Sequence, residues 1–417
     1  GEPIIGANVV VKGTTNGIIT DLDGRFTLSN VPDKGTISIS FIGYQDQEIS
    51  VAGKTNLQVT LQEDNAMLDE VVVVGYGVQK KSDVTGAMAR VGEKELKAMP
   101  VKNALEGMQG KTAGVDITSS QRPGEVGGIN IRGVRSIDAE QGPLYVVDGM
   151  IIQTGGIENI NPSDIEAIDI LKDASATAVF GVRGANGVIL ITTKRGAEGK
   201  AKISFTTSAG VNVRTKELEF ANSYQYASYV NMMRTNDGNE PLYSDEQLAA
   251  FRDHTNPLLY PDINWIDYCM NKAAFQSQHN VSISGGTNNM RYFVSAGLFT
   301  QDGMFKQFNL TDDFNFDYKR YNYRANLDFD ISKTTLLSVN IGGRVESKRT
   351  PESGEDQNQL FRKLYWAVPF AGAGIVNGER VVSNSEVLPF TGVDGLSSYY
   401  GKGFQTKTTN VLNVDLA

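Results

Sequence analysis

Alternation of apolar and polar residues dominates the chain from about residue 202 onward. Ile203 and Phe205 fall on one side of an extended strand, whereas Lys202 and Ser204 fall on the other. The period of two predicts antiparallel strands over residues 202–213, 290–300, 314–319, 323–331, 337–345 and 411–416. A soluble sandwich and a membrane barrel both give this period, because each has one dry and one wet face.

Two features favour a transmembrane β-barrel over a soluble sandwich. The polar sides carry charged and amide groups, such as Arg324, Asn326 and Asp328, which suit a wet lumen. Aromatic residues gather near strand ends, as expected for an interfacial girdle: Tyr292, Phe293, Tyr318, Tyr321 and Tyr323. The polar stretches 214–277 and 346–405 are expected to be long loops, with one helix over 244–251 that Ser244 caps.

Residues 1–62 are predicted to form a small Ig-like β-sandwich. Turn signals separate short β-rich segments at 8–11, 17–20, 25–28, 36–42 and 57–61. Asp21 and Asp23 could suggest calcium, but the remaining EF-hand ligands are missing, so we predict a plain turn with Gly24 at positive φ.

Residues 63–70 are polar and acidic, as in a linker, and four consecutive valines follow at 71–74. Such a run strongly favours extended backbone. Two interpretations stay open: a buried strand, or an exposed strand that pairs with the sheet edge of another protein. No hairpin mate for the run is apparent in the sequence.

Residues 78–196 are predicted to be mixed α/β. Short helices are expected over 101–109 and 173–180, and strands over 115–119, 129–132, 144–147, 165–171 and 187–192. Glycines are frequent in this region, but none follows a strand as GxGxxG, so a nucleotide site is not expected.

Composition excludes several classes of function. The net charge of −9 without a basic tract argues against nucleic acid as a partner. Cys269 is the single cysteine, which excludes an internal disulfide and a thiolate metal cluster. Neither histidine lies in HExxH, and GxSxG is absent. We therefore predict no enzymatic activity, no catalytic residue, no metal site and no cofactor.

Two long segments carry a resemblance to a known family. Residues 143–149 (PLYVVDG) and 171–194 resemble the plug-domain signature of SusC-like TonB-dependent outer-membrane transporters, the SusC/RagA type. Residues 69–77 are similar to the family's TonB-box segment, and residues 1–62 resemble its carboxypeptidase-regulatory-like extension. The implied domains are 1–62, a linker and TonB-box segment at 63–77, a plug domain at 78–196, and the first barrel strands at 197–417. Since such barrels have about 22 strands, the barrel is expected to be incomplete here.

The resemblance implies import rather than chemistry. A transporter of this family lies in the outer membrane of a Gram-negative bacterium. TonB, with ExbB and ExbD, would bind and pull one segment of it: Asp69, Glu70, Val71, Val72, Val73, Val74 and Gly75. A SusD-like lipoprotein would cover the barrel, which contacts outer-membrane lipid. The expected cargo is an oligosaccharide, with an oligopeptide as the alternative. A soluble surface adhesin would explain the sandwich and the alternation, but not the plug-like segment.

Candidate cargo contacts lie in two places. Arg135, Ser136 and Asp138 occupy a loop before the plug signature, although a solvated loop without a ligand is the alternative. Tyr399, Tyr400 and Phe404 could stack on sugar rings, although girdle or lid contact would explain them equally.

Overall fold

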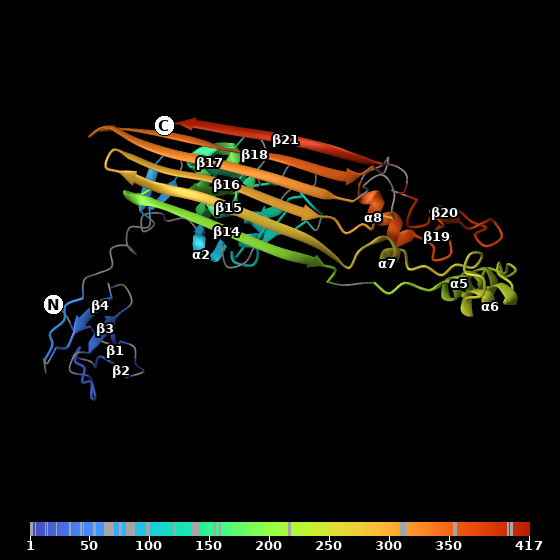
Figure 1. Cartoon of the computed structure of the whole chain (residues 1–417), viewed down its shortest axis with the longest axis horizontal. Helices are drawn as coiled ribbons and strands as arrows, with labels where there is room; N and C mark the ends of the chain where they lie inside the picture. The colour runs from blue at the N-terminus through green and yellow to red at the C-terminus, as the bar shows by residue number, and fades with distance from the viewer. Residues whose placement is uncertain are drawn as a thin grey trace. The chain divides into compact units, whose positions relative to one another are not determined.

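The computed structural model describes residues 3–417 apart from residues 5, 13, 15, 22, 33–34, 42–43, 45, 53–55, 62–70, 75–76, 81–87, 97–100, 121, 135–141, 153–155, 158–159, 216–217, 309–314, 353–356, 398–399 and 401–402. For residues 71–74, 77–80 and 357–358 only the backbone is described. The chain divides into two compact units, Gly1–Ala87 and Met88–Ala417 (Figure 1).

The first unit contains a four-stranded antiparallel sheet of order β2-β1-β3-β4. Its strands are β1 (Asn8–Val11), β2 (Gly17–Ile19), β3 (Thr36–Ser40) and β4 (Gln47–Ser50). The predicted strands over 25–28 and 57–61 are wrong, because both segments lie outside the sheet. Their apolar side chains, including Phe26 and Leu57, nevertheless pack on the core of β1 and β3, which explains their alternation. β4 escaped prediction because GlnGluIleSer lacks a clear apolar period.

The Asp21 turn and a separate hairpin complete this unit. The Asp21 carboxylate accepts hydrogen bonds from the backbone N–H groups of Asp23 and Arg25, and Gly24 has φ 71°, which confirms the predicted turn. Strand β5 (Val71–Val74) pairs in antiparallel register with β6 (Gly77–Lys80).

The plug region, which we define as the described part of 88–196, is built on a five-stranded sheet of order β11-β10-β13-β12-β7. Strands β10 (Leu144–Val147) and β13 (Val188–Thr193) are parallel, whereas β7 (Met88–Gly92), β11 (Met150–Ile151) and β12 (Ile165–Leu171) pair antiparallel. The smaller elements are α2 (Glu93–Leu96), α3 (Ala104–Met108), η3 (Pro162–Asp164), α4 (Ala174–Thr177), η4 (Ala178–Gly184) and the hairpin of β8 (Val115–Ile117) with β9 (Ile129–Ile131).

The wall is a six-stranded antiparallel sheet of order β14-β15-β16-β17-β18-β21. Its strands are β14 (Gly199–Val213), β15 (Ala273–Thr287), β16 (Met290–Asp302), β17 (Asp317–Ser332), β18 (Thr335–Pro351) and β21 (Phe404–Leu416). Tight turns at 288–289 and 333–334 join strands at one end, and long connections join them at the other. This asymmetry is typical of outer-membrane barrels.

The expected long loops form a folded cap, but their predicted bounds are wrong where residues 273–277 belong to β15 and residues 346–351 to β18. The cap consists of α5 (Ser223–Asn236), α6 (Asp245–Arg252), α7 (Trp265–Cys269), α8 (Gln357–Trp366) and the hairpin of β19 (Gly372–Val376) with β20 (Glu379–Val382). Ser244 and Gln247 form the predicted capping box of α6. Buried aromatic residues from both stretches share one core, including Tyr243 and Phe370. None of the helices that the structure describes is long and apolar enough to cross a bilayer.

Candidate functional site at the plug and wall interface

The wall is apolar on the face away from the plug region and polar on the face toward it. Ile203 and Phe205 are 74% and 68% exposed, whereas Arg320 is 4% and Asn326 is 1% exposed. Other buried polar residues of the wall are Asn280, Asn322, Arg324, Asp328, Asn340 and Arg344. A soluble sandwich buries its apolar face instead. The inverted arrangement therefore decides between the two interpretations of the alternation in favour of the barrel.

Strand β17 contacts the plug region along one row of inward side chains. Arg320 donates from Nη2 to the backbone oxygen of Lys102 at 2.7 Å. Asn326 donates from Nδ2 to Thr193 Oγ1 and to the backbone oxygen of Lys194, each at 2.8 Å. Arg195 of the plug region forms an ion pair with Asp328 at 2.7 Å, and Ser338 also donates to that carboxylate.

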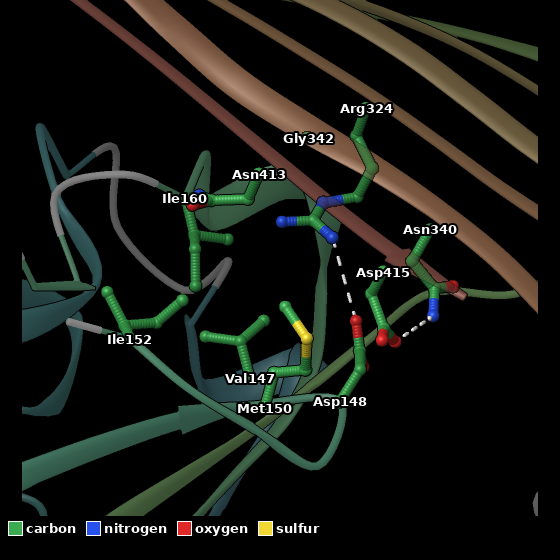
Figure 2. Close-up of a pocket in the computed structure, with 10 residues that line it drawn as sticks. All are labelled: Val147, Asp148, Met150, Ile152, Ile160, Arg324, Asn340, Gly342, Asn413 and Asp415. Carbon is green, nitrogen blue, oxygen red and sulfur yellow. Dashed lines mark hydrogen bonds and ion pairs between the residues drawn. The ribbon is translucent and has the colours of Figure 1, made fainter. Parts of the chain in front are cut away.

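Asp148 joins the plug sheet to the wall (Figure 2). It occupies the turn between β10 and β11 with φ 50°, followed by Gly149 with φ 92°, as a tight Asp-Gly hairpin requires. Its carboxylate accepts from Thr193 N at 2.9 Å and from Thr193 Oγ1 at 2.6 Å. Arg324 lies 3.6 Å away, and both side chains of this ion pair are less than a tenth exposed. The carboxylate thus connects the turn, strand β13 and strand β17.

A second contact involves η3 and strands β15 and β16. Asn161 donates from Nδ2 to Asn280 Oδ1 at 2.5 Å, and Asn280 donates to Ser163 Oγ at 3.1 Å. Gly297 makes this approach possible, since a Cβ there would lie 2.3 Å from Asn161 Nδ2. Burial raises the pKa of nearby Asp164, although the neighbouring Ser295 hydroxyl and the positive charge of Arg324 oppose the shift.

The loop between β8 and β9 reaches the cap end of the wall. Lys348 pairs with Glu125 at 3.3 Å. Burial disfavours the charged form of Glu125, but Lys348 and the Ser120 hydroxyl outweigh this effect, so the pKa of Glu125 is lowered. Arg122 of the same loop lies over the ring of Phe361 in α8, 5.1 Å from its centroid. The loop therefore contacts the wall and the cap together.

The girdle prediction is wrong for two of its aromatic residues. Tyr318 and Phe293 are 4% and 3% exposed on the inward face, where the Tyr318 hydroxyl donates to Glu346. Tyr318 and Tyr323 stand at positions of opposite parity on the continuous strand β17, so they lie on opposite faces. Tyr321 and Tyr323 do lie on the apolar face, at 50% and 37% exposure.

A small cavity lies between the plug region and strands β18 and β21. Its volume is about 30 Å³, which is room for one or two water molecules. Figure 2 shows that apolar side chains of the plug region face polar side chains of the wall across it. The lining residues are Val147, Asp148, Met150, Ile152, Ile160, Arg324, Asn340, Gly342, Asn413 and Asp415.

The candidate cargo residues are only partly within the described chain. Arg135, Ser136, Asp138 and Tyr399 lie outside the described residues. Tyr400 packs on the cap core and donates to the backbone oxygen of Gly378 at 3.2 Å. Phe404 begins β21 and is 44% exposed, with the Arg349 guanidinium 4.5 Å from its ring centroid.

The TonB-box candidates fall on the β5–β6 hairpin. Asp69, Glu70 and Gly75 lie outside the described residues, whereas Val71, Val72, Val73 and Val74 form β5. Strand β5 does have a hairpin mate, contrary to the prediction, since Val73 pairs with Val78 and Val74 with Gly77. The mate was missed because GlyValGlnLys alone gives a weak strand signal. β5 and β6 form a two-stranded sheet, so among the described residues one edge of β5 is unpaired.

Sequence reasoning missed most residues of the interface. Arg320 could have been found, because it stands four residues before Arg324 and therefore falls on the same inward face of a continuous strand. Asn161 and Lys102 contact the wall from a turn and a helix start, where no periodicity marks them. Among the described residues, no group of acidic, histidine and cysteine side chains could hold a metal ion.

Comparison with known proteins agrees with this architecture. Residues 1–73 match the CarboxypepD_reg-like domain, and residues 80–188 match the TonB-dependent Receptor Plug Domain. The TonB-dependent receptor SusC of Bacteroides thetaiotaomicron is 38% identical over 386 residues, which is 88% of this chain and 36% of SusC. The chain belongs to the SusC-like TonB-dependent receptors.

Solved structures of this family share the fold. The RagAB peptide importer in its open-open state superposes with a TM-score of 0.55 at 28% identity, covering 67% of this chain and 32% of that chain. Its closed-closed state gives a TM-score of 0.52 at 29% identity, covering 64% and 31%. This SusC-like chain thus spans about a third of the length of the relatives it matches.

Proposed function

We propose that the protein of which this chain is part imports a nutrient across the outer membrane of a Gram-negative bacterium, driven by TonB. The inverted wall supports this proposal best. An apolar outer face suits lipid, and an inner face of buried charges and amides holds a folded plug by specific contacts. A plug held in this way closes a pore in the resting state and needs work to open.

The coupling segment would be residues 69–75, with β5 as its core. β5 keeps one unpaired edge in its hairpin with β6. TonB would add a strand to that edge, and backbone hydrogen bonds would carry the load. An isolated two-stranded hairpin is marginally stable in water, so exchange of β6 for the TonB strand is a second route.

The cargo and lid are proposed by analogy and by surface chemistry. An oligosaccharide is the first candidate, since the inner wall is rich in amide groups that hydrogen-bond to hydroxyls. An oligopeptide is the second, because the RagAB structures are those of a peptide importer. A SusD-like lipoprotein would cover the cap end. Arg135, Ser136, Asp138, Tyr399, Tyr400 and Phe404 remain the proposed cargo contacts.

The deciding experiment compares growth of a host strain on single glycans and peptides. Deletion of residues 69–75 from the full-length protein is expected to abolish growth on one cargo, with binding of that cargo at the cell surface unchanged. Val73→Pro, which removes a backbone N–H, is expected to impair import more than the matched control Val73→Thr, which keeps it. Normal import by the deletion variant would refute coupling through this segment.

A further inference from the structure

The contacts between the plug region and the wall are unevenly distributed. Strands β15 and β17 hold the plug region through hydrogen bonds and ion pairs that involve Asn280, Arg324, Asn326 and Asp328. At the cap end, Lys348 of β18 pairs with Glu125. Strands β18 and β21 contribute Asn340, Asn413 and Asp415 at the cavity of Figure 2. Within the described part of the chain, none of these three residues forms a hydrogen bond with the plug region.

The side chains on the two sides of this cavity do not match. The plug region presents Val147, Met150 and Ile152 from the β10–β11 hairpin, which cannot satisfy polar partners. On the wall, Asn340 is 7% exposed and donates from Nδ2 to Asp415 at 3.0 Å. Its Oδ1 has no hydrogen-bond partner, although it is buried. A buried acceptor facing an apolar surface needs water or a ligand that donates to it.

Resting on the proposed function, we propose that cargo passes through this seam, between the β10–β11 hairpin and strands β18 and β21. Within the described chain, no hydrogen bond joins the β10–β11 hairpin to the residues of β18 and β21 that line the cavity. Asp148 forms the turn of this hairpin, so its ion pair with Arg324 must break when the hairpin moves away from the wall.

The chemistry of the seam fits an uncharged, hydrogen-bonding cargo. Asn340 and Asn413 offer amide donors and acceptors, and Asp415 offers a carboxylate that accepts from hydroxyl or amide groups. Sugar hydroxyls and peptide amides both meet this requirement. In the resting state the cavity admits only water, so the hairpin must move away from the wall before cargo can pass.

The test uses the full-length protein in cells with its native cysteines replaced, Cys269→Ala included. Asn340→Cys reports on the seam, and Asn280→Cys is the matched control, because both asparagines face inward and are 7% and 9% exposed. The probe is a membrane-impermeant maleimide. We expect faster labelling at position 340 than at position 280 in cells with active TonB and saturating cargo, and equally slow labelling of both without TonB.

Two other labelling results would overturn the proposed path through the seam. Equal acceleration at both positions would mean that the plug region leaves the wall as a whole. No acceleration at either position, with wild-type import intact, would place the path elsewhere. If the wild type shows no TonB-dependent import of any cargo, the proposed function itself fails. If Asn340→Cys does not assemble, Asn413→Cys reports on the same seam.

Discussion

Removing the Arg324 guanidinium should loosen the plug region at a known point. At 3.6 Å, the Coulomb attraction between Arg324 and Asp148 is about 4–5 kcal/mol with an effective dielectric constant of about 20. Arg324→Met loses this attraction but leaves Asp148 its two hydrogen bonds from Thr193. Breaking a buried ion pair from one side usually costs about 3–5 kcal/mol. We expect a loss of about 3 kcal/mol, at the low end of that range, because these hydrogen bonds remain.

Hydrogen exchange followed by mass spectrometry measures this loss in the full-length protein in detergent. Peptides that cover β10 and β13 should exchange on the order of 100-fold faster in Arg324→Met, if local opening limits exchange. Arg291→Met is the control, since the pair of Arg291 with Asp330 is more than a third exposed on both sides and worth below about 1 kcal/mol.

A double-mutant cycle with Asp148→Asn separates the loss of the Arg324–Asp148 ion pair from any other destabilising effect of the Arg324 substitution. The two substitutions should be non-additive, because each removes the same attraction. A coupling energy below about 0.5 kcal/mol would refute the assignment of Asp148 as the junction between the plug sheet and the wall.

Two further substitutions test the contact at strands β15 and β16. Burial raises the pKa of Asp164, so the folded state holds a proton that the unfolded state releases near its usual pKa of about 3.9. The stability of the wild type should therefore fall as the pH rises from about 4 toward the raised pKa. Asp164→Asn should flatten this profile and unfold at a higher temperature than wild type at pH 7. A wild-type profile without this fall would contradict the raised pKa of Asp164. Gly297→Ala should lower the free energy of unfolding by about 1–3 kcal/mol, because the new Cβ would displace Asn161. Gly210→Ala is the control and should unfold like wild type, because its Cβ would meet its nearest neighbour at 3.6 Å. Equal unfolding temperatures for both alanine variants would contradict the close packing at Gly297.

Most strands of the wall could be predicted because a period of two is local information, but β15 (Ala273–Thr287) was missed. Each inward residue of β17 from Arg324 to Asp328 was assigned to the polar side from the sequence alone. The error at Tyr318 arose because the period was evaluated in two pieces, 314–319 and 323–331. A single continuous strand, paired residue by residue from Asp317 to Asp330, fixes the parity of both pieces. Continuity of pairing is tertiary information that the pattern does not contain.

The cap could not be predicted for a different reason. Its cores combine residues that are far apart in the sequence, as in the hydrogen bond from the Tyr243 hydroxyl to the backbone oxygen of Val387. Trp265 likewise donates to the backbone oxygen of Val368 across two separate stretches. The aromatic residues that fill these cores are isolated within polar sequence, so neither stretch shows an apolar period of its own. The capping box at Ser244 gave a local signal for α6, whereas the equivalent box of Asn222 and Gln225 at the start of α5 was not used.

The uneven interface bears on how a pulled plug would open. Complete release would break the contacts of Arg324, Asn326 and Asn280, together with the outer contact of Lys348. Each neutral hydrogen bond contributes about 0.5–1.5 kcal/mol and each bond to a charged group about 1.5–3 kcal/mol. Their joint loss therefore requires more work than separation at the seam, where the ion pair of Arg324 with Asp148 breaks but the contacts of Asn326, Asn280 and Lys348 stay. Exposing Met150 and Ile152 does cost hydrophobic free energy, but a cargo molecule in the seam would cover part of that surface. Local opening beside Asn340 is therefore the lower-energy route in the described interface.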